Sequence, residues 1–374
     1  MAWPLLIVAL TFLALGLLTC RPSPDWSPWR LAVLAGEWGH LLAAGALLVA
    51  AVAWSGSGRT SGIAAAVASL AAVLLLKPSY QAYQQGRDAK RALDALGAPP
   101  VKRPSFSLLH SLRPRAVSGR VETLTFADRL EMDLYLPPTR EVPAPCVVIV
   151  HGGGWDSGAR DQLRGFNAWM AGRGYAVAAI SYRLAPAHRW PAQREDVRAA
   201  LAFLTSQGAS LGVDANRVVL LGRSAGGQIA LNAAYTLKDP SIRGVIGLYA
   251  PADLHLGYAS GREDDQLSSR QLLRQYLGGT PAEQPVQYDD ASATTHVAPG
   301  VPPTLLVHGG LDTLVWNRHT ERLAGRLAAA AVPHVVVPLP WATHAVEVNL
   351  NGPGGQLTTY AVERFLAWAT RTGK

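Results

Sequence analysis

The sequence contains Gly222-Arg223-Ser224-Ala225-Gly226-Gly227 at the junction of two stretches of different character. Residues 217–221 are almost entirely apolar, which is typical of a buried strand, whereas residues 228–234 have the composition of a helix. A serine in a small-residue turn between a strand and a helix is the context of a nucleophile elbow, where the flanking chain comes so close that only glycine fits. The segment therefore predicts that Ser224 is a nucleophile above the edge of a sheet.

A second glycine-rich motif, His151-Gly152-Gly153-Gly154-Trp155, precedes the serine in the sequence. It follows residues 145–150, which again have the pattern of a buried strand. In this order, a His-Gly-Gly-Gly turn supplies backbone N–H groups that stabilise the oxyanion of a tetrahedral intermediate. The predicted oxyanion hole comprises Gly152, Gly153, Gly154 and Ala225. Trp155 either lines the substrate pocket or serves as a packing anchor.

A serine hydroxyl becomes a good nucleophile only when a base removes its proton and an acid holds that base in the correct tautomer. After a nucleophile elbow the acid comes next in the sequence and the histidine last. Asp312 follows the predicted strand 304–307 and the turn His308-Gly309-Gly310. His344 follows the last predicted strand, so a loop can bring its imidazole over the sheet edge. We therefore predict a catalytic triad of Ser224, Asp312 and His344.

Other acids and histidines compete for these two roles. Asp289 and Asp290 lie in a loop with no strand to position them. Glu347 is too near His344 in the sequence to approach its ring from behind. Two histidines at strand ends are expected to pack or to bond the backbone, namely His308 and His334. Two more are expected on the surface, namely His296 and His319.

The positive charge of the chain is concentrated in its N-terminal part. The 374 residues include 34 Lys and Arg and 26 Asp and Glu, a formal net charge of +8. Residues 1–116 hold 11 of the basic and 4 of the acidic residues, a net charge of +7. Basic residues beside apolar segments favour the cytoplasmic side of a membrane and anionic lipid head groups. The charge therefore indicates contact with a membrane surface and not with nucleic acid.

Three apolar blocks occupy the N-terminal part, at residues 5–19, 31–54 and 62–76. The middle block, of about 24 residues, is long enough to cross a hydrocarbon core of about 30 Å, whereas the outer blocks need flanking residues to do so. The alternative is a cleaved signal followed by two buried helices, but residues 1–10 lack the basic residues of a signal peptide. We predict about three transmembrane helices within residues 1–76.

The basic residues also predict the orientation of these helices. Three spans put Arg21 and Arg30 on the same side as the basic residues after the last block, and only Arg59 on the opposite side. The residues after the last block are Lys77, Arg87, Lys90, Arg91, Lys102, Arg103, Arg113 and Arg115. The positive-inside rule then predicts a multi-pass membrane protein whose catalytic part faces the cytoplasm. Loss of one span would reverse this orientation.

The two cysteines, Cys20 and Cys146, are far apart in the sequence, and both are expected to be reduced packing residues. The sequence contains no CxxC motif, no HExxH motif and no glycine-rich phosphate loop. No metal ion or organic cofactor is therefore expected.

After the apolar blocks the chain changes in pattern. Residues 77–116 form a basic, proline-containing connector with a short helix expected at 81–96. Residues 117–374 begin with a predicted hairpin, and apolar strands then alternate with helices, which predicts an α/β fold with a mostly parallel sheet covered on both faces. Residues 250–301 interrupt this alternation and are expected to form a partly helical, lid-like insertion.

Five separated segments of residues 117–374 resemble the esterase/lipase branch of the α/β-hydrolases, related to hormone-sensitive lipase and bacterial carboxylesterases. These segments are His151–Trp155, Ser181-Tyr182-Arg183-Leu184-Ala185-Pro186, Trp190-Pro191-Ala192 with Asp196-Val197, Gly222–Gly227 and His308-Gly309-Gly310-Leu311-Asp312. The resemblance implies the α/β-hydrolase fold, the same triad and oxyanion region, and a buried structural pair of Arg183 and Asp196. Arg223 departs from the commonest elbow, which has Asp or Thr before the serine, and is closer to feruloyl-esterase-like relatives.

The combined prediction is a membrane-anchored serine esterase that hydrolyses a small-molecule or lipid ester through an acyl-enzyme intermediate. Two alternatives remain open at this point. One is an amidase or peptidase on the same scaffold, because pocket details set the preference for the leaving group. The other is a catalytically silent membrane adaptor. The sequence does not indicate the acyl-chain length or the oligomeric state.

Overall fold

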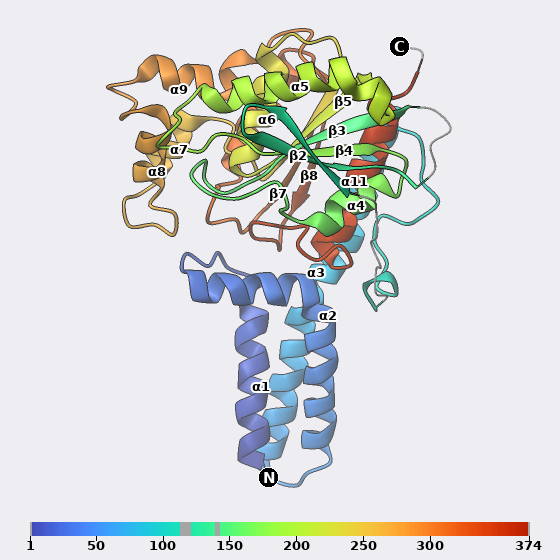
Figure 1. The fold of residues 1–374 in the computed structure, drawn as a ribbon. Helices are drawn as coiled ribbons and strands as arrows, with labels where there is room; N and C mark the ends of the chain where they lie inside the picture. Colours follow the sequence, from blue (N-terminus) through green and yellow to red (C-terminus); the bar gives the residue numbers. More distant parts are fainter. Residues whose placement is uncertain (1, 113–120, 139–142, 373–374) are drawn as a thin grey trace.

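A computed structural model describes residues 2–112, 121–138 and 143–372. Arg113 and Arg115, and residue 117 where the catalytic domain is expected to start, lie outside these ranges. The N-terminal helices pack side by side, and a larger body contains the strands (Figure 1).

The described residues form one eight-stranded sheet with the order β1-β2-β4-β3-β5-β6-β7-β8. The two pairings that involve β2 are antiparallel and the other five are parallel. The mostly parallel sheet and its leading hairpin are therefore as predicted. The strands are β1 (Val121–Ala127), β2 (Leu130–Tyr135), β3 (Ala144–Val150), β4 (Ala176–Ile180), β5 (Val213–Arg223), β6 (Ile242–Leu248), β7 (Thr304–Gly309) and β8 (His334–Leu339).

Helices cover both faces of this sheet. Along β5, Val218 and Leu220 pack on one face and Val219 and Leu221 on the other, which explains why the strand is apolar without alternation. One face is covered by α5 (Ala192–Leu211), α6 (Ala225–Thr236) and α10 (Arg318–Ala329). The other face is covered by α4 (Arg164–Ala171), α11 (Pro353–Ala369) and the end of an N-terminal helix.

The long segment between β6 and β7 is folded into short helices. They are α7 (Leu254–Ser260), α8 (Ser269–Leu277), α9 (Pro285–Ala291) and the 3-10 turn η2 (Ala293–His296). Leu273, Tyr276 and Tyr288 from this segment are buried in the core on the α6 side of the sheet. Tertiary packing therefore holds these helices in place, since helices this short are not stable alone.

The N-terminal helices are α1 (Ala2–Leu17), α2 (Trp26–Trp54) and α3 (Arg59–Ala95), and a 3-10 turn, η1 (His110–Leu112), follows them. By length and composition α2 and α3 could each cross a membrane, whereas α1 is shorter, and a buried core helix can meet the same criteria. In Figure 1 the first part of α2 lies across the end of the bundle, next to the strand-containing body.

The short helix expected at 81–96 is the end of α3, which runs without interruption through Pro78. An internal proline costs one helical hydrogen bond and disfavours a helix. Here the end of α3 buries Ala82, Ala89 and Leu93 against the same core as α11, and this packing offsets the cost. α3 therefore connects the N-terminal bundle directly to the sheet-containing body.

Candidate active site

Ser224 lies at the tip of the turn between β5 and α6, with backbone angles of φ 52° and ψ −122°. A positive φ is uncommon for a residue with a side chain and marks a strained turn. A Cβ atom at Gly222 would overlap the backbone of Gly226, and one at Gly226 would overlap the carbonyl groups of Val150 and His151. The glycines are therefore required by close packing of the chain, as a nucleophile elbow demands.

Asp312 and His344 meet beyond the carboxyl ends of β7 and β8. Asp312 Oδ2 accepts a hydrogen bond of 2.7 Å from His344 Nδ1, and Asp312 Oδ1 accepts two of 2.9 Å from the N–H groups of Leu314 and Val315. Burial alone would raise the pKa of Asp312, but the imidazoles of His344 and His308 outweigh it and hold this pKa well below its usual range. The ionised carboxylate fixes the imidazole with Nδ1 protonated and Nε2 available as a base.

A cavity of about 950 Å³ brings the predicted site residues together. Its lining includes Gly152, Gly153, Gly154, Trp155, Ser224, Ala225, Asp312 and His344. Within the described part of the chain, Ser224 and His344 share this cavity without a hydrogen bond between them. Such catalytic hydrogen bonds are often long in unliganded enzymes and tighten when substrate binds.

The glycine turn after β3 contributes backbone donors beside Ser224. Gly153 and Gly154 have positive φ angles of 126° and 62°, which side chains rarely tolerate. The N–H of Gly152 donates to Gln162 Oε1 at 2.9 Å and supports the turn. This leaves the N–H groups of Gly153, Gly154 and Ala225 as the candidates for the predicted oxyanion hole, whereas that of Gly152 is already bonded.

Trp155 lines the cavity and is also a packing anchor. Its ring stacks on Tyr276 at a centroid distance of 4.6 Å, and its Nε1 donates to Gln228 Oε1 at 2.8 Å. Tyr276 donates to the same oxygen at 3.0 Å, and Gln228 Nε2 donates to the carbonyl of Ala291 at 2.8 Å. Gln228 thus joins the glycine turn after β3 to the insertion, a role for which the sequence holds no signal.

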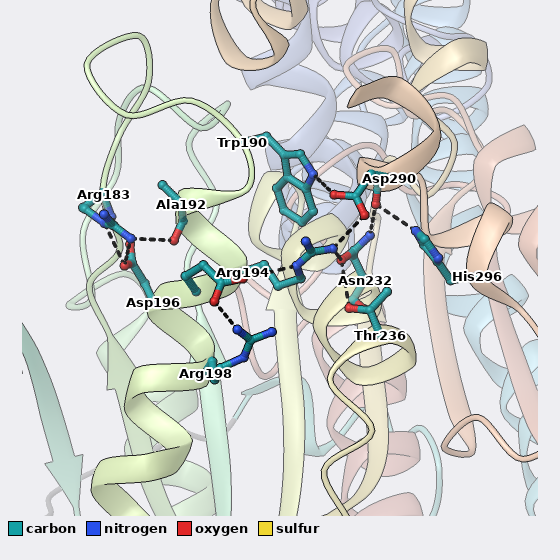
Figure 2. Close-up of polar contacts among 11 residues, drawn as sticks. Arg183, Trp190, Ala192, Arg194, Asp196, Arg198, Asn232, Thr236, Asp290 and His296 are labelled. Carbon is teal, nitrogen blue, oxygen red and sulfur yellow. Dashed lines mark hydrogen bonds and ion pairs between the residues drawn. The ribbon is translucent and has the colours of Figure 1, made fainter. Parts of the chain in front are cut away.

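The competing acids lie elsewhere. Figure 2 shows that Asp290 accepts hydrogen bonds from Trp190 Nε1 at 2.7 Å and Arg194 at 2.9 Å, while its carbonyl accepts one from His296 at 2.8 Å. Asp289 pairs with His255 at 2.9 Å. Neither aspartate lines the cavity that contains Ser224. Asp290 instead anchors α9 to α5.

Glu347, the third competing acid, forms a buried ion pair with Arg223 at 2.9 Å. It also accepts a hydrogen bond of 2.7 Å from the hydroxyl of Tyr249, while Arg223 donates to Asn167 at 3.1 Å. Arg223 directly precedes the serine, so this pair ties the elbow to the loop that carries His344. An arginine in an otherwise buried elbow needs a carboxylate partner, and that requirement is the signal in the sequence.

The predicted surface position of His319 is wrong, because this side chain is only 2% exposed and lines the cavity. Its helix, α10, places it on the same face as Leu323 and Leu327, which are buried in the core. His308 bonds Thr320 at 2.7 Å and the carbonyl of Val315 at 2.9 Å. His334 bonds the carbonyl of Val332 at 2.9 Å, and His296 is half-buried.

Arg183 and Asp196 form the pair that the resemblance implied. Arg183 Nε and its backbone N–H each donate to the carboxylate of Asp196 at 2.8 Å, and its guanidinium also bonds the carbonyl of Ala192 (Figure 2). Asp196 is buried, but the Arg183 side chain is 39% exposed. The pair therefore closes the loop at the edge of the core and does not lie inside it.

Fold and site together define an α/β-hydrolase with a serine at its elbow. Residues 132–327, more than half of the chain, match the family model BD-FAE. The chain belongs to the BD-FAE family. This membership confirms the resemblance to carboxylic ester hydrolases of the esterase and lipase type.

Two related proteins of Mycobacterium tuberculosis are similar in sequence. Esterase LipC is 30% identical over 249 residues, which cover 61% of this chain and 59% of LipC. Probable carboxylic ester hydrolase LipM is 28% identical over 272 residues, which cover 70% of this chain and 63% of LipM. The chain thus spans about three fifths of the length of these relatives.

Solved structures share the fold. The bacterial heroin esterase superposes with a TM-score of 0.60 at 22% identity, over 78% of this chain and 93% of that structure. An esterase from Pyrobaculum calidifontis superposes with a TM-score of 0.57 at 22% identity, over 76% of this chain and 91% of that structure. Similarity at this level of identity extends to the fold alone.

Proposed function

We propose that this protein is a membrane-anchored serine esterase that hydrolyses carboxylic esters through an acyl-enzyme. The main support is the hydrogen bond between His344 and Asp312 in a cavity that Ser224 also lines. The relatives LipC and LipM carry the names of ester hydrolases, which favours an ester over an amide.

In the proposed mechanism, Ser224 Oγ attacks the ester carbonyl carbon while His344 Nε2 takes the hydroxyl proton. The N–H groups of Gly153, Gly154 and Ala225 stabilise the oxyanion, and loss of one such donor typically costs about 3 kcal/mol of barrier. The tetrahedral intermediate collapses, and His344 gives its proton to the departing alcohol. Water then attacks the acyl-enzyme with His344 as base, which releases the acid and restores Ser224.

The N-terminal bundle supports the membrane anchor. Small side chains fill its interior, and they include Ala9, Ala43, Ala46, Ala50, Ala64, Ala68, Ala71 and Ala72. Large apolar side chains lie on its outside, and they include Ile7, Leu10, Leu47, Leu48, Ile63, Leu70 and Val73. In water, the hydrophobic effect would favour large apolar side chains inside the bundle and small ones outside. In lipid, small residues allow close helix packing and large apolar residues face the acyl chains.

We further propose that the hydrolase body faces the cytoplasm. Arg21, Arg30 and Lys77 are at the end of the bundle next to this body, and Arg59 is at the other end. The positive-inside rule favours this orientation. In this organisation residues 1–76 form the membrane region, residues 77–116 the connector and residues 117–374 the catalytic domain, with α3 continuous across the first boundary.

The test is labelling of the full-length protein with a fluorophosphonate, followed by hydrolysis of p-nitrophenyl esters and the matching anilides. We expect labelling that the Ser224→Ala variant abolishes, and faster hydrolysis of esters than of anilides. Labelling with faster anilide hydrolysis would indicate an amidase. Absence of labelling that depends on Ser224 would instead favour the silent adaptor.

A further inference from the structure

The wall of the catalytic cavity includes residues from the N-terminal bundle. Pro22, Pro24 and Trp26, in the connection between α1 and α2 and at the start of α2, line the same cavity as Ser224. They lie about 200 residues before the serine in the sequence, outside the segments that match the hydrolase family. The proposed membrane region therefore contributes to the wall of this cavity.

This connection is attached to the hydrolase body at two neighbouring residues that line the cavity, Thr313 and Gln266. The carbonyl of Ser23 accepts a hydrogen bond of 3.0 Å from Thr313, which follows the acid Asp312. Trp26 Nε1 donates to the carbonyl of Gln266 at 3.0 Å, in the loop between α7 and α8. Thr313 also donates to Gln266 Oε1 at 2.8 Å, so the wall is attached where the loop that carries Asp312 meets the insertion.

Large apolar side chains are exposed along the start of α2, at the junction with the bundle. Figure 1 shows the first part of α2 lying across the end of the bundle beneath the hydrolase body. Trp26, Leu31 and Leu34 are exposed along this part of α2. Trp316, which lines the cavity, is also exposed. Arg30, which precedes Leu31 in the sequence, is exposed as well. Exposed tryptophan and leucine side chains near a cation are typical of a segment at a membrane surface.

We propose that the substrate is an acyl ester resident in the membrane, whose acyl chain enters the catalytic cavity past Pro22, Pro24 and Trp26. This inference rests on the proposed esterase activity and membrane anchor. The cavity is lined by apolar groups such as Leu272, Leu273 and Val315, so a chain that moves into it from lipid exchanges one apolar environment for another. A chain that arrived through water would first have to expose every CH₂ group to solvent.

The test uses the full-length protein in phosphatidylcholine vesicles. Two probes are compared, p-nitrophenyl palmitate dissolved in the bilayer and p-nitrophenyl acetate added to the water. Each rate is divided by the amount of Ser224 that fluorophosphonate labels. We expect Trp26→Ala to lower kcat/KM for palmitate by about tenfold and for acetate by less than about twofold. Trp54→Ala removes a tryptophan from the far end of the same helix, and we expect it to change neither rate.

The remaining outcomes separate this inference from the proposed function. Equal losses on both esters per labelled serine would mean that Trp26 only supports the fold, and would overturn the inference. A wild-type protein that hydrolyses acetate but not bilayer palmitate would also overturn it, and would leave the esterase proposal intact. Absence of hydrolysis and labelling would overturn both proposals. If Trp26→Phe hydrolyses palmitate faster than Trp26→Ala does, the result would support the proposal that the wall acts through its apolar surface.

Discussion

At the scale of single residues, the buried ion pair of Arg223 and Glu347 connects two parts of the site. The two side chains are 1% and 0% exposed, so neither charge has water as an alternative partner. Removing one member of a buried pair leaves the other charge unpaired, which costs more than the pair itself contributes. The contact therefore binds the serine elbow and the histidine loop into one unit.

Replacing Glu347 with Gln is expected to lower the free energy of unfolding by about 3 to 5 kcal/mol, because the charge of Arg223 stays buried without its partner. It should also lower kcat, since the loop with His344 loses an attachment. Thermal unfolding in detergent and ester hydrolysis measure the two effects. Asp264→Asn is the control, because the side chains of its pair with Arg262 are 72% and 71% exposed and should contribute nothing measurable. An unfolding midpoint equal to that of the wild type would contradict the prediction.

His319 is expected to make the free energy of unfolding fall as the pH falls. Burial lowers its pKa to about 4 from a usual 6.5, so the folded protein holds it neutral. The contribution of neutral His319 to the free energy of unfolding is complete above about pH 6.5. This contribution is lost as the pH falls towards about 4, because the unfolded chain binds the proton first. The loss amounts to about 3 kcal/mol. His319→Asn should therefore show a flatter dependence of the unfolding midpoint on pH over this range, and parallel curves would refute this.

At the scale of elements, the strands and the insertion differ in what stabilises them. Strands β3 and β5 are apolar throughout because helices cover both faces, and this pattern is visible in the sequence. The insertion has no such pattern, and its helices α7 and α9 have only seven residues each. Hydrogen bonds that Asp290 accepts from Trp190, Arg194 and Asn232 hold α9 against α5 and α6 (Figure 2).

Replacing Asp290 with Ala is expected to loosen the insertion, because Trp190 and Arg194 lose their shared acceptor. Residues of α7 and α8 line the cavity, so KM should rise more than kcat falls, and limited proteolysis should cut within residues 250–301 faster. Hydrogen bonds to charged groups typically contribute about 1.5 to 3 kcal/mol. The adjacent Asp289→Ala is a matched control, since its side chain is 61% exposed and should be dispensable. Equal behaviour of both variants would rule out the anchoring role.

At the scale of the whole molecule, the bundle and the hydrolase body are joined at the start of α11. Glu37 on α2 accepts hydrogen bonds of 3.1 to 3.4 Å from the N–H groups of Gly354 and Gly355, and its carbonyl accepts one of 3.0 Å from Asn349. These N–H groups belong to the first turn of α11 and have no partner within the helix. Glu37 thus caps a helix that belongs to another part of the molecule.

Glu37→Ala is expected to lower the unfolding midpoint, because a cap typically contributes about 1 kcal/mol and the N–H groups stay buried without it. Activity on p-nitrophenyl acetate should also fall, since α11 begins just after the loop with His344. Glu37→Gln keeps an acceptor oxygen and should lose less on both measures. An equal loss in both variants would contradict the capping role and point to the charge alone.

Much of the hydrolase body could be predicted because its signals are local. Buried strands, the turns at Ser224 and Gly152–Gly154, and the order of Asp312 and His344 all leave marks within a few residues. The position of His319, the length of α3 and the role of Glu347 were not predicted. Each depends on which distant segment packs against it, and no short stretch of sequence records that.

By itself, the sequence determined the α/β class, the elbow and the candidates for catalysis, because strand apolarity and glycine turns follow from short-range sterics and burial. Only the tertiary structure decided that the connection before α2 walls the catalytic cavity, that Glu37 caps α11 and that Arg223 pairs with Glu347. These contacts join residues more than a hundred positions apart, and their partners become neighbours only when the whole chain has packed.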